Sequence, residues 1–124
     1  MKQALILFGH GARDPRWAEP FHQLQSKLQQ QAGSNLLVRL AYLELMTPSL
    51  LDVITELAGQ GVEKARVVPV FFGQGGHLRK DFPVLLEDCR VQFPSMDIQA
   101  TPPVGEWDAV LQSIVAGALH IVNQ

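Results

Sequence analysis

Two histidines in this sequence stand directly after apolar runs, where an imidazole would be presented at the end of a buried strand. His10 lies between two glycines in "ILFGHGARDP", and His77 ends the segment "GQGGH". Imidazole is a good ligand for borderline divalent metals such as Co²⁺, Fe²⁺, Ni²⁺ and Zn²⁺. In its neutral form it also accepts a proton close to neutral pH. Both histidines are therefore candidates for metal binding or proton acceptance, and a local hydrogen bond in a loop is the plain alternative for either one alone.

Charged side chains lie close to both histidines. Arg13 follows the first, and Arg79 and Lys80 follow the second. These cations are either solvated loop charges or a ring that attracts an anionic ligand. Glu44, in "YLELMTP", is either a solvated carboxylate at a strand end or a third member of a site. Two imidazoles and a carboxylate suit a divalent metal and leave coordination positions open, as a reactive site requires.

Neighbouring residues offer support to such a site. Gly75 and Gly76 are either plain turn formers or places where the main chain approaches a bulky ligand closely. Asp14 is a candidate cap for the first helix, because a short carboxylate before a helix accepts a bond from a free N–H. Asp81 is a candidate cap for a later helix, or a partner that holds a histidine ring in place.

These residues must be positioned by an alternation of strand and helix that occurs four times. Continuous apolar runs indicate strands covered on both faces, and apolar residues three and four apart indicate helices with one buried stripe. The predicted strands are 4–8, 36–45, 65–72 and 97–104; the predicted helices are 16–31, 48–59, one after the "GQGGH" segment, and 107–122.

This alternation predicts an α/β fold, a single flavodoxin-like domain over residues 1–124. Its four-stranded parallel sheet has the order 2-1-3-4, with helices on both faces. Open sheets of this kind bind ligands at the carboxyl ends of their strands, beside the point where the strand order reverses. His10, Glu44 and His77 follow the first, second and third strands, so we expect them to converge on one rim of the sheet.

Some local details are predicted as well. Thr47 is a candidate N-cap for the second helix, with Pro48 at its first position. Pro69 predicts a bulge or a local edge in the third strand, because proline lacks the N–H that a ladder needs. Cys89 falls on the apolar stripe of the third helix together with Phe82, Leu85 and Leu86. The fourth helix is expected to turn an apolar stripe inward, formed by Val110, Leu111, Ile114, Val115 and Ala118.

Composition excludes several classes of protein. The 124 residues are 47% hydrophobic and 18% charged, with a formal charge of −2, which fits a globular domain and gives no footprint for nucleic acid or an anionic membrane. Cys89 is the single cysteine, which favours a reducing, cytoplasmic compartment. The N-terminus is a poor secretory signal, and no apolar run approaches the roughly 20 residues that span a bilayer. His22 and His120 fall within predicted helices, where a structural role is expected.

Three segments together resemble the small sirohydrochlorin chelatases, the CbiX-type cobaltochelatases. "LFGHGARDP" is similar to the opening motif of that family, "AYLEL" followed by "TPSL" to its middle segment, and "VPVFFGQGGHLRKDFP" to its second signature. The resemblance covers nearly the whole chain in order. It implies a chelatase-like fold and ATP-independent insertion of Co²⁺ or Fe²⁺ into sirohydrochlorin, in cobalamin or sirohaem biosynthesis, with no permanently bound cofactor.

The resemblance also implies roles for particular residues. His10 and His77 match the metal-binding histidines, and Glu44 is implied as a helper in metal binding or proton removal. Arg13, Arg79 and Lys80 are the candidates for contacts to the carboxylates of the tetrapyrrole. Ala12 departs from the family, because a serine is common there.

The partners expected are a tetrapyrrole, a divalent metal and a second copy of the chain, since larger chelatases contain two such units and this sequence has one. The third or fourth helix would supply the contact surface of that homodimer. Two other classes stay open. A phosphohistidine enzyme would explain a histidine near an arginine, although Gly9 and not arginine precedes His10. A metal or tetrapyrrole carrier would bind without turnover.

Overall fold

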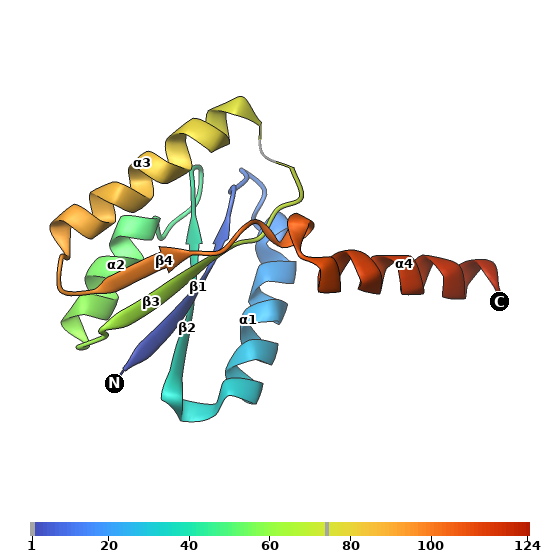
Figure 1. The fold of residues 1–124 in the computed structure, drawn as a ribbon, viewed down its shortest axis with the longest axis horizontal. Helices are drawn as coiled ribbons and strands as arrows, with labels where there is room; N and C mark the ends of the chain where they lie inside the picture. Colours follow the sequence, from blue (N-terminus) through green and yellow to red (C-terminus); the bar gives the residue numbers. More distant parts are fainter. Residues whose placement is uncertain (1, 74) are drawn as a thin grey trace.

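The computed structural model describes residues 2–73 and 75–124 (Figure 1). Four strands alternate with four α-helices, and three short 3₁₀ turns lie between them. The strands are β1 (Gln3–Gly9), β2 (Leu36–Tyr42), β3 (Lys64–Pro69) and β4 (Asp97–Ala100). The α-helices are α1 (Glu19–Ala32), α2 (Leu50–Gly59), α3 (Gly76–Gln92) and α4 (Asp108–Val122). The 3₁₀ turns are η1 (Pro15–Ala18), η2 (Gly33–Asn35) and η3 (Val104–Glu106).

The sheet confirms the predicted topology. Its order is β2-β1-β3-β4 and all three pairings are parallel. β1 pairs with β2 from Gln3 opposite Leu36 to Gly9 opposite Tyr42, and with β3 on its other side. The strand order therefore reverses beside β1, and the residues that follow β1, β2 and β3 leave the sheet at the same edge.

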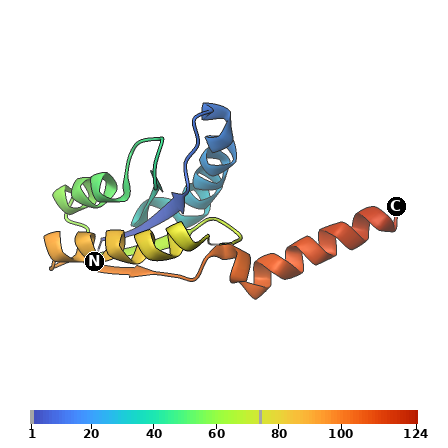
Figure 2. The same ribbon diagram turned by 90° about the horizontal axis from the view of Figure 1, so that it is seen from above.

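Helices cover both faces of the sheet, as predicted, but unequally (Figure 2). α2 and α3 pack on one face, where Ile6, Phe8 and Val67 meet Ile54 and Leu86 in one buried cluster. α1 packs on the other face. The crossovers explain this arrangement: β1 to β2 runs one way across the sheet, whereas β2 to β3 and β3 to β4 run the other way, and right-handed connections then place α1 opposite α2 and α3.

The first two helices begin differently from the prediction. η1 precedes α1, and Asp14 caps η1 by accepting a hydrogen bond from the Arg16 N–H at 2.9 Å. α2 begins at Leu50, and its N-cap is Ser49, not Thr47. The Ser49 hydroxyl accepts a bond from the Asp52 N–H, and the Asp52 carboxylate accepts one from the Ser49 N–H, each at 3.1 Å. This reciprocal capping box fixes the start of the helix, so Pro48 lies before it and not at its first position.

β2 and β4 end earlier than predicted, at Tyr42 and Ala100, and β3 ends at Pro69. Of the two predictions for Pro69, the local edge is right. The Val70 N–H donates to the Phe8 carbonyl on the β1 side, so position 69 faces the β4 side. β4 has already ended there, because its last residue, Ala100, pairs with Val67. The missing N–H of Pro69 therefore costs no ladder bond.

α4 overturns the prediction of an inward stripe. Instead of packing on the sheet it projects from the body of the molecule as a straight arm (Figures 1 and 2). Its side chains are exposed, including Leu111 at 40%, Ile114 at 49% and Leu119 at 56%. The helical spacing of apolar residues identifies the stripe on α4, but it does not indicate which surface the stripe packs against.

Within the described residues, none of the helices is both long enough and apolar enough to cross a bilayer. Cys89 is fully buried in the α2–α3 core, as predicted for the stripe of the third helix.

Candidate functional site

An imidazole and a carboxylate meet at the edge of the sheet where the strand order reverses. His10 follows β1 and Glu44 follows β2, and the Nε2 atom of His10 lies 3.1 Å from Oε1 of Glu44. Both side chains are 46% exposed, so the pair faces solvent and is open to a ligand. The predicted convergence of these two residues is thereby confirmed.

The main chain holds the pair in register. Where the two strands end, the Leu43 N–H donates to the carbonyl of Gly9, the last residue of β1, at 2.9 Å, and the Glu44 N–H donates to the His10 carbonyl at 3.1 Å. The segments that carry His10 and Glu44 are therefore held side by side directly after the strands. This main-chain pairing fixes the distance between the α-carbons of His10 and Glu44. The short contact between their side chains therefore rests on the main chain and not on flexible loops.

Gly11 makes this close approach possible. Its φ is +96°, and a Cβ at this position would lie 1.8 Å from the Glu44 carbonyl oxygen. A side chain would therefore force apart the two segments that carry His10 and Glu44. Gly9 is constrained too, because a Cβ there would lie 2.9 Å from the ring of Phe21. The signal in the sequence for both constraints is the position of the two glycines on either side of His10.

Leu45, the residue after Glu44, has an unusual backbone conformation. Its φ is +65°, the one positive value outside glycine among the described residues, and its side chain is 57% exposed. Left-handed backbone is costly for a bulky residue other than glycine, so the flanking structure must hold Leu45 in it. It reverses the chain immediately after Glu44. Nothing in the residue types predicted this turn, and sequence analysis had extended the second strand through it.

The second predicted histidine lies in the first turn of α3. The helix begins at Gly76, with Gly75 as its N-cap, so His77 is its second residue. Leu78 is buried, and the rings of Phe8 and Phe82 stack with their centres 5.0 Å apart. These contacts tie the start of α3 to the end of β1, next to His10. The side chain of His77 and all of Gln74 lie outside the described part of the structure, so its predicted approach to His10 stays a prediction.

The predicted cations occupy the same edge. Arg13, Arg79 and Lys80 are all exposed, the first in the β1–η1 connection and the other two in the first turns of α3. Arg16 is engaged elsewhere, since its guanidinium binds both carboxylate oxygens of Asp14. This bond lowers the pKa of Asp14 below its ordinary value. The cations predicted to attract an anion thus lie in the segments that follow β1 and β3, and the Asp14 charge is already compensated.

Two further predictions concern α3. Asp81 does not cap the helix, because it is the sixth residue and Gly75 holds the N-cap position. Its alternative role, holding a histidine ring, stays a prediction. Among the atoms that the structure describes, none lies within 4 Å of the place that a Cβ on Gly75 or Gly76 would take. The protein's own packing therefore does not require glycine at these positions, and the space beside them is open.

The His10–Glu44 pair offers a metal ion one nitrogen ligand and one oxygen ligand. Among the side chains that the structure describes, no cluster of three or more His, Cys, Asp or Glu residues is arranged to hold a metal ion. The described part of the site is thus not a closed structural metal centre, which takes four protein ligands.

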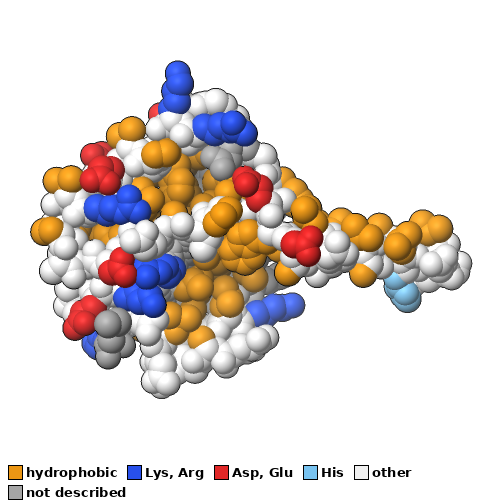
Figure 3. Space-filling model, in the orientation of Figure 1, with side chains coloured by type: hydrophobic (Ala, Val, Ile, Leu, Met, Phe, Trp, Pro, Cys, Tyr) orange, Lys and Arg blue, Asp and Glu red, His pale blue; other side chains and the backbone are white. Residues whose placement is uncertain are grey.

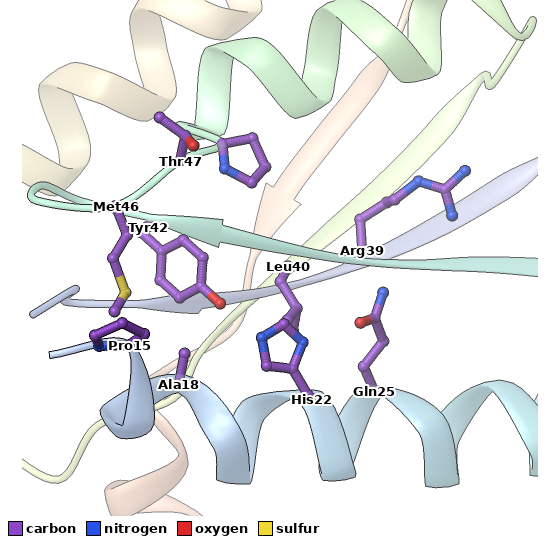
Figure 4. A pocket seen from close by; sticks show the side chains of 10 residues that line it. Pro15, Ala18, His22, Gln25, Arg39, Leu40, Tyr42, Met46 and Thr47 are labelled. Atoms are coloured by element: carbon purple, nitrogen blue, oxygen red, sulfur yellow. The ribbon is translucent and has the colours of Figure 1, made fainter.

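A separate hollow of about 420 Å³ lies between α1 and β2 (Figure 4). The side chains of His22, Tyr42 and Met46 line it, and burial raises the pKa of the Tyr42 hydroxyl. His10 and Glu44 are not part of its lining. His22 lies in α1 and His120 near the end of α4, both within helices as predicted.

The doubly wound parallel sheet, with a solvent-facing imidazole and carboxylate where the strand order reverses, defines an α/β protein with a candidate ligand site at the carboxyl ends of its strands. The family model CbiX matches residues 4–118, and the chain belongs to this family.

Similar proteins support the assignment of the chain to the CbiX family. The sirohydrochlorin cobaltochelatase of Methanosarcina acetivorans is 35% identical over 85 residues, which are 68% of this chain and 65% of that protein's own length. The solved structure of a CbiX protein from Marinobacter aquaeolei VT8 is 32% identical, with a TM-score of 0.82 over 98% of both chains. The sirohydrochlorin chelatase SirB of Bacillus subtilis subspecies spizizenii, solved with cobalt, shares the fold at 24% identity and a TM-score of 0.75, over 98% of this chain and 51% of SirB.

Proposed function

We propose that this protein inserts a divalent metal, Co²⁺ or else Fe²⁺, into sirohydrochlorin without ATP. The observation that carries the proposal is the His10–Glu44 pair, with Nε2 and Oε1 3.1 Å apart at the open edge of a CbiX-family sheet. The relative from Methanosarcina acetivorans is a sirohydrochlorin cobaltochelatase, and SirB was solved with cobalt. Both names support Co²⁺ as the first metal to test.

The geometry of the pair suggests how a proton leaves. An ionised Glu44 accepts a hydrogen bond, so in this arrangement Nε2 of His10 carries the proton. A metal can bind this nitrogen only in the other neutral tautomer, so Oε1 of Glu44, the nearest acceptor, takes the Nε2 proton while Nδ1 takes a proton from solvent. Two protons must also leave the tetrapyrrole as the metal enters it. A carboxylate beside the metal-binding nitrogen can pass such protons on to solvent, because it is 46% exposed.

The remaining predicted residues receive roles around this pair. We propose His77 as the second metal ligand, since α3 brings its main chain to the same edge. Arg13, Arg79 and Lys80 attract the carboxylates of sirohydrochlorin, and the open space beside Gly75 and Gly76 lets the macrocycle approach the main chain. Contacts to remote carboxylates can offset roughly 1–5 kcal/mol of ring distortion, which exposes the nitrogen lone pairs.

Metal insertion by the purified protein tests this function. Sirohydrochlorin is mixed with Co²⁺ or Fe²⁺, and the change in its absorbance is followed for the wild type, His10→Ala and His77→Ala. We expect a large loss of rate in both variants, and His120→Ala on the distant α4 is the matched control with wild-type rate. Near wild-type rates in both His10→Ala and His77→Ala would overturn the assignment.

The same experiment separates the alternatives. Stoichiometric binding of metal or tetrapyrrole without turnover would identify a carrier. Hydrolysis of a phosphomonoester without metal insertion would identify a phosphohistidine enzyme. Competition between the two metals on one substrate ranks them, which residue types cannot do because Co²⁺ and Fe²⁺ prefer similar ligands.

A further inference from the structure

Hollows lie on both sides of α1, and they differ in what they offer a ligand. The hollow toward β3 and the base of α4, of about 380 Å³, has only apolar side chains in its lining, and Figure 3 shows apolar side chains gathered between the body of the molecule and α4. The hollow at the free edge of the sheet, of about 420 Å³, is lined by residues of η1, α1, β2 and the β2–α2 connection, and we call it the edge hollow. It contains polar groups as well, and these determine what it can bind.

The Tyr42 side chain brings a hydroxyl into the edge hollow. Its ring packs near those of Trp17 and Phe21, with ring centres 6.2 and 6.3 Å away, and only 4% of the residue is exposed. Within the described residues the hydroxyl forms no hydrogen bond, whereas every fully buried polar side-chain atom has a partner. The Tyr42 oxygen is therefore in contact with the hollow, and Figure 4 shows it with the His22 ring in the gap between β2 and α1. Burial raises the pKa of this hydroxyl, so it keeps its proton and can donate it in a hydrogen bond.

The main chain of Leu40 adds a donor and an acceptor to the same hollow. β2 is the outer strand of the sheet, and alternate residues of a strand turn their N–H and C=O groups to opposite edges. The Tyr42 N–H faces away from β1, because it donates to the Pro48 carbonyl at 2.9 Å. Leu40 lies two residues earlier, so its N–H and C=O also face away from β1, toward the edge hollow that Leu40 lines.

The positions on either side of Leu40 along this edge are already covered. The Gln25 amide donates to the Val38 carbonyl at 2.9 Å, and the Gln29 side-chain oxygen accepts from the Val38 N–H at 3.0 Å. Tyr42 is covered by the β2–α2 connection. Within the described residues, no comparable bond covers the main chain of Leu40. An added β-strand pairs along several residues in a row, so this edge admits a single amide group and not an extended peptide.

The charges around the edge hollow favour a neutral ligand. Arg39 is part of the lining, but its guanidinium donates to both carboxylate oxygens of Glu56, at 2.9 and 3.1 Å. The other lining residues that the structure describes carry no permanent charge, and Pro15, Met46 and Pro48 give the walls an apolar surface. A neutral molecule with an apolar body therefore fits this lining better than an ion does.

We propose that the edge hollow binds a small neutral molecule that carries a carboxamide or a lactam on an apolar body. The ligand N–H donates to the Leu40 carbonyl, and the ligand carbonyl accepts from the Leu40 N–H, the exchange that paired residues of antiparallel strands make. The Tyr42 hydroxyl donates a further bond to the ligand. A volume of about 420 Å³ lies within the range of roughly 300–1,000 Å³ that small-molecule sites occupy. This inference concerns a second site and does not rest on the proposed metal insertion.

Titration followed by proton–nitrogen NMR spectra of the isotope-labelled protein tests the site. The probe is benzamide, a neutral aromatic carboxamide, and we expect saturable shifts of the Leu40 amide signal and of its neighbours in the edge hollow. N,N-dimethylbenzamide is the matched ligand, because it lacks only the amide N–H bonds and should bind about three- to tenfold more weakly. Benzoate has nearly the same shape as benzamide but is an anion, and it should also bind more weakly.

Several results of this titration would overturn the proposal. Equal binding of N,N-dimethylbenzamide would exclude the exchange with Leu40, and tighter binding of benzoate would identify a carboxylate site. Shifts centred outside the edge hollow would place the probe elsewhere. Spectra unchanged by millimolar benzamide would mean that the hollow holds only water.

Tyr42→Phe tests the hydroxyl in the same titration. The change removes one oxygen and keeps the ring in its place near Trp17 and Phe21, so we expect the fold to persist. The affinity for benzamide should fall about three- to tenfold, as for the loss of one neutral hydrogen bond. Ser113→Ala is the matched control, because it also removes one hydroxyl, on α4 and outside the hollow, and should leave the affinity unchanged. Wild-type affinity in Tyr42→Phe would contradict the proposal.

Discussion

Nε2 of His10 and Oε1 of Glu44 lie 3.1 Å apart although 34 residues separate them in the chain. The contact extends the pairing of β1 with β2, because the two bonds from the Leu43 and Glu44 N–H groups continue that pairing past the last strand residues. The site is thus an extension of the sheet and inherits its rigidity. Changes that separate the two segments should damage the site even where they touch neither side chain.

Gly11→Ala tests this dependence on the main chain. The new Cβ would meet the Glu44 carbonyl oxygen at 1.8 Å, so the segments that carry His10 and Glu44 must move apart. We expect metal insertion to fall at least about tenfold, because small displacements of catalytic groups are costly, together with a loss of stability of about 1–3 kcal/mol. Denaturant unfolding and the absorbance assay measure the two effects.

Gly33→Ala is the matched control. Gly33 also has a positive φ, +70°, but nothing lies within 4 Å of a Cβ built there. With ψ at −154° its backbone lies in a region that essentially only glycine adopts, so this variant should lose about 1–3 kcal/mol from the backbone alone and keep its activity. Equal activity losses in both variants would mean that general destabilisation, and not the separation of the pair, lowers the rate.

Glu44→Gln tests the carboxylate as proton acceptor. The amide has nearly the same shape but cannot take a proton from His10 or from the substrate. We expect the rate of metal insertion to fall by about 10²-fold or more, as for loss of a general base, while stability changes little because the side chain is 46% exposed. Glu63 is exposed and directly precedes β3, at the amino ends of the strands and away from the pair. Glu63→Gln should therefore leave the rate unchanged. A wild-type rate for Glu44→Gln would exclude the role.

Ser49→Ala and Thr47→Ala decide which residue caps α2. Ser49 makes the capping box with Asp52, so its loss should cost about 1 kcal/mol of unfolding free energy. Thr47 lies outside the helix and its loss should cost less. Urea unfolding of both variants measures the difference, and a larger cost for Thr47→Ala would contradict the assignment.

The capping box also shows where residue patterns are ambiguous. "TPSLLD" contains two hydroxyl residues before the helix, and the rule that proline favours the first helical position selects Thr47. The pair Ser49 and Asp52, three residues apart, is the competing signal, and the structure follows it.

The strands, the helices and the sheet order were predictable because many residues contribute to the pattern that indicates each of them. Long apolar runs and stripes predicted every strand and α-helix and the sheet order, and placed His10 and Glu44 on one rim. The short contact between them arises from two main-chain bonds beyond the strands, and Leu45 reverses the chain with no residue-type signal. The exposed course of α4 depends on the anchored turn at Trp107, which periodicity does not describe.

The thiol of Cys89 gives a prediction for alkaline pH. Burial, and then the negative charge of Asp88, raise the pKa of Cys89 in the folded protein. The neutral thiol therefore contributes stability that is fully present below the pKa of the unfolded state, about 8.5, and is lost as pH rises through the folded pKa. We expect the unfolding free energy of the wild type to fall more steeply above about pH 8.5 than that of Cys89→Ala. Parallel curves would show that another group governs this range. As an independent check, Ellman's reagent at pH 8 should react with Cys89 only after denaturation, because the folded thiol is fully buried.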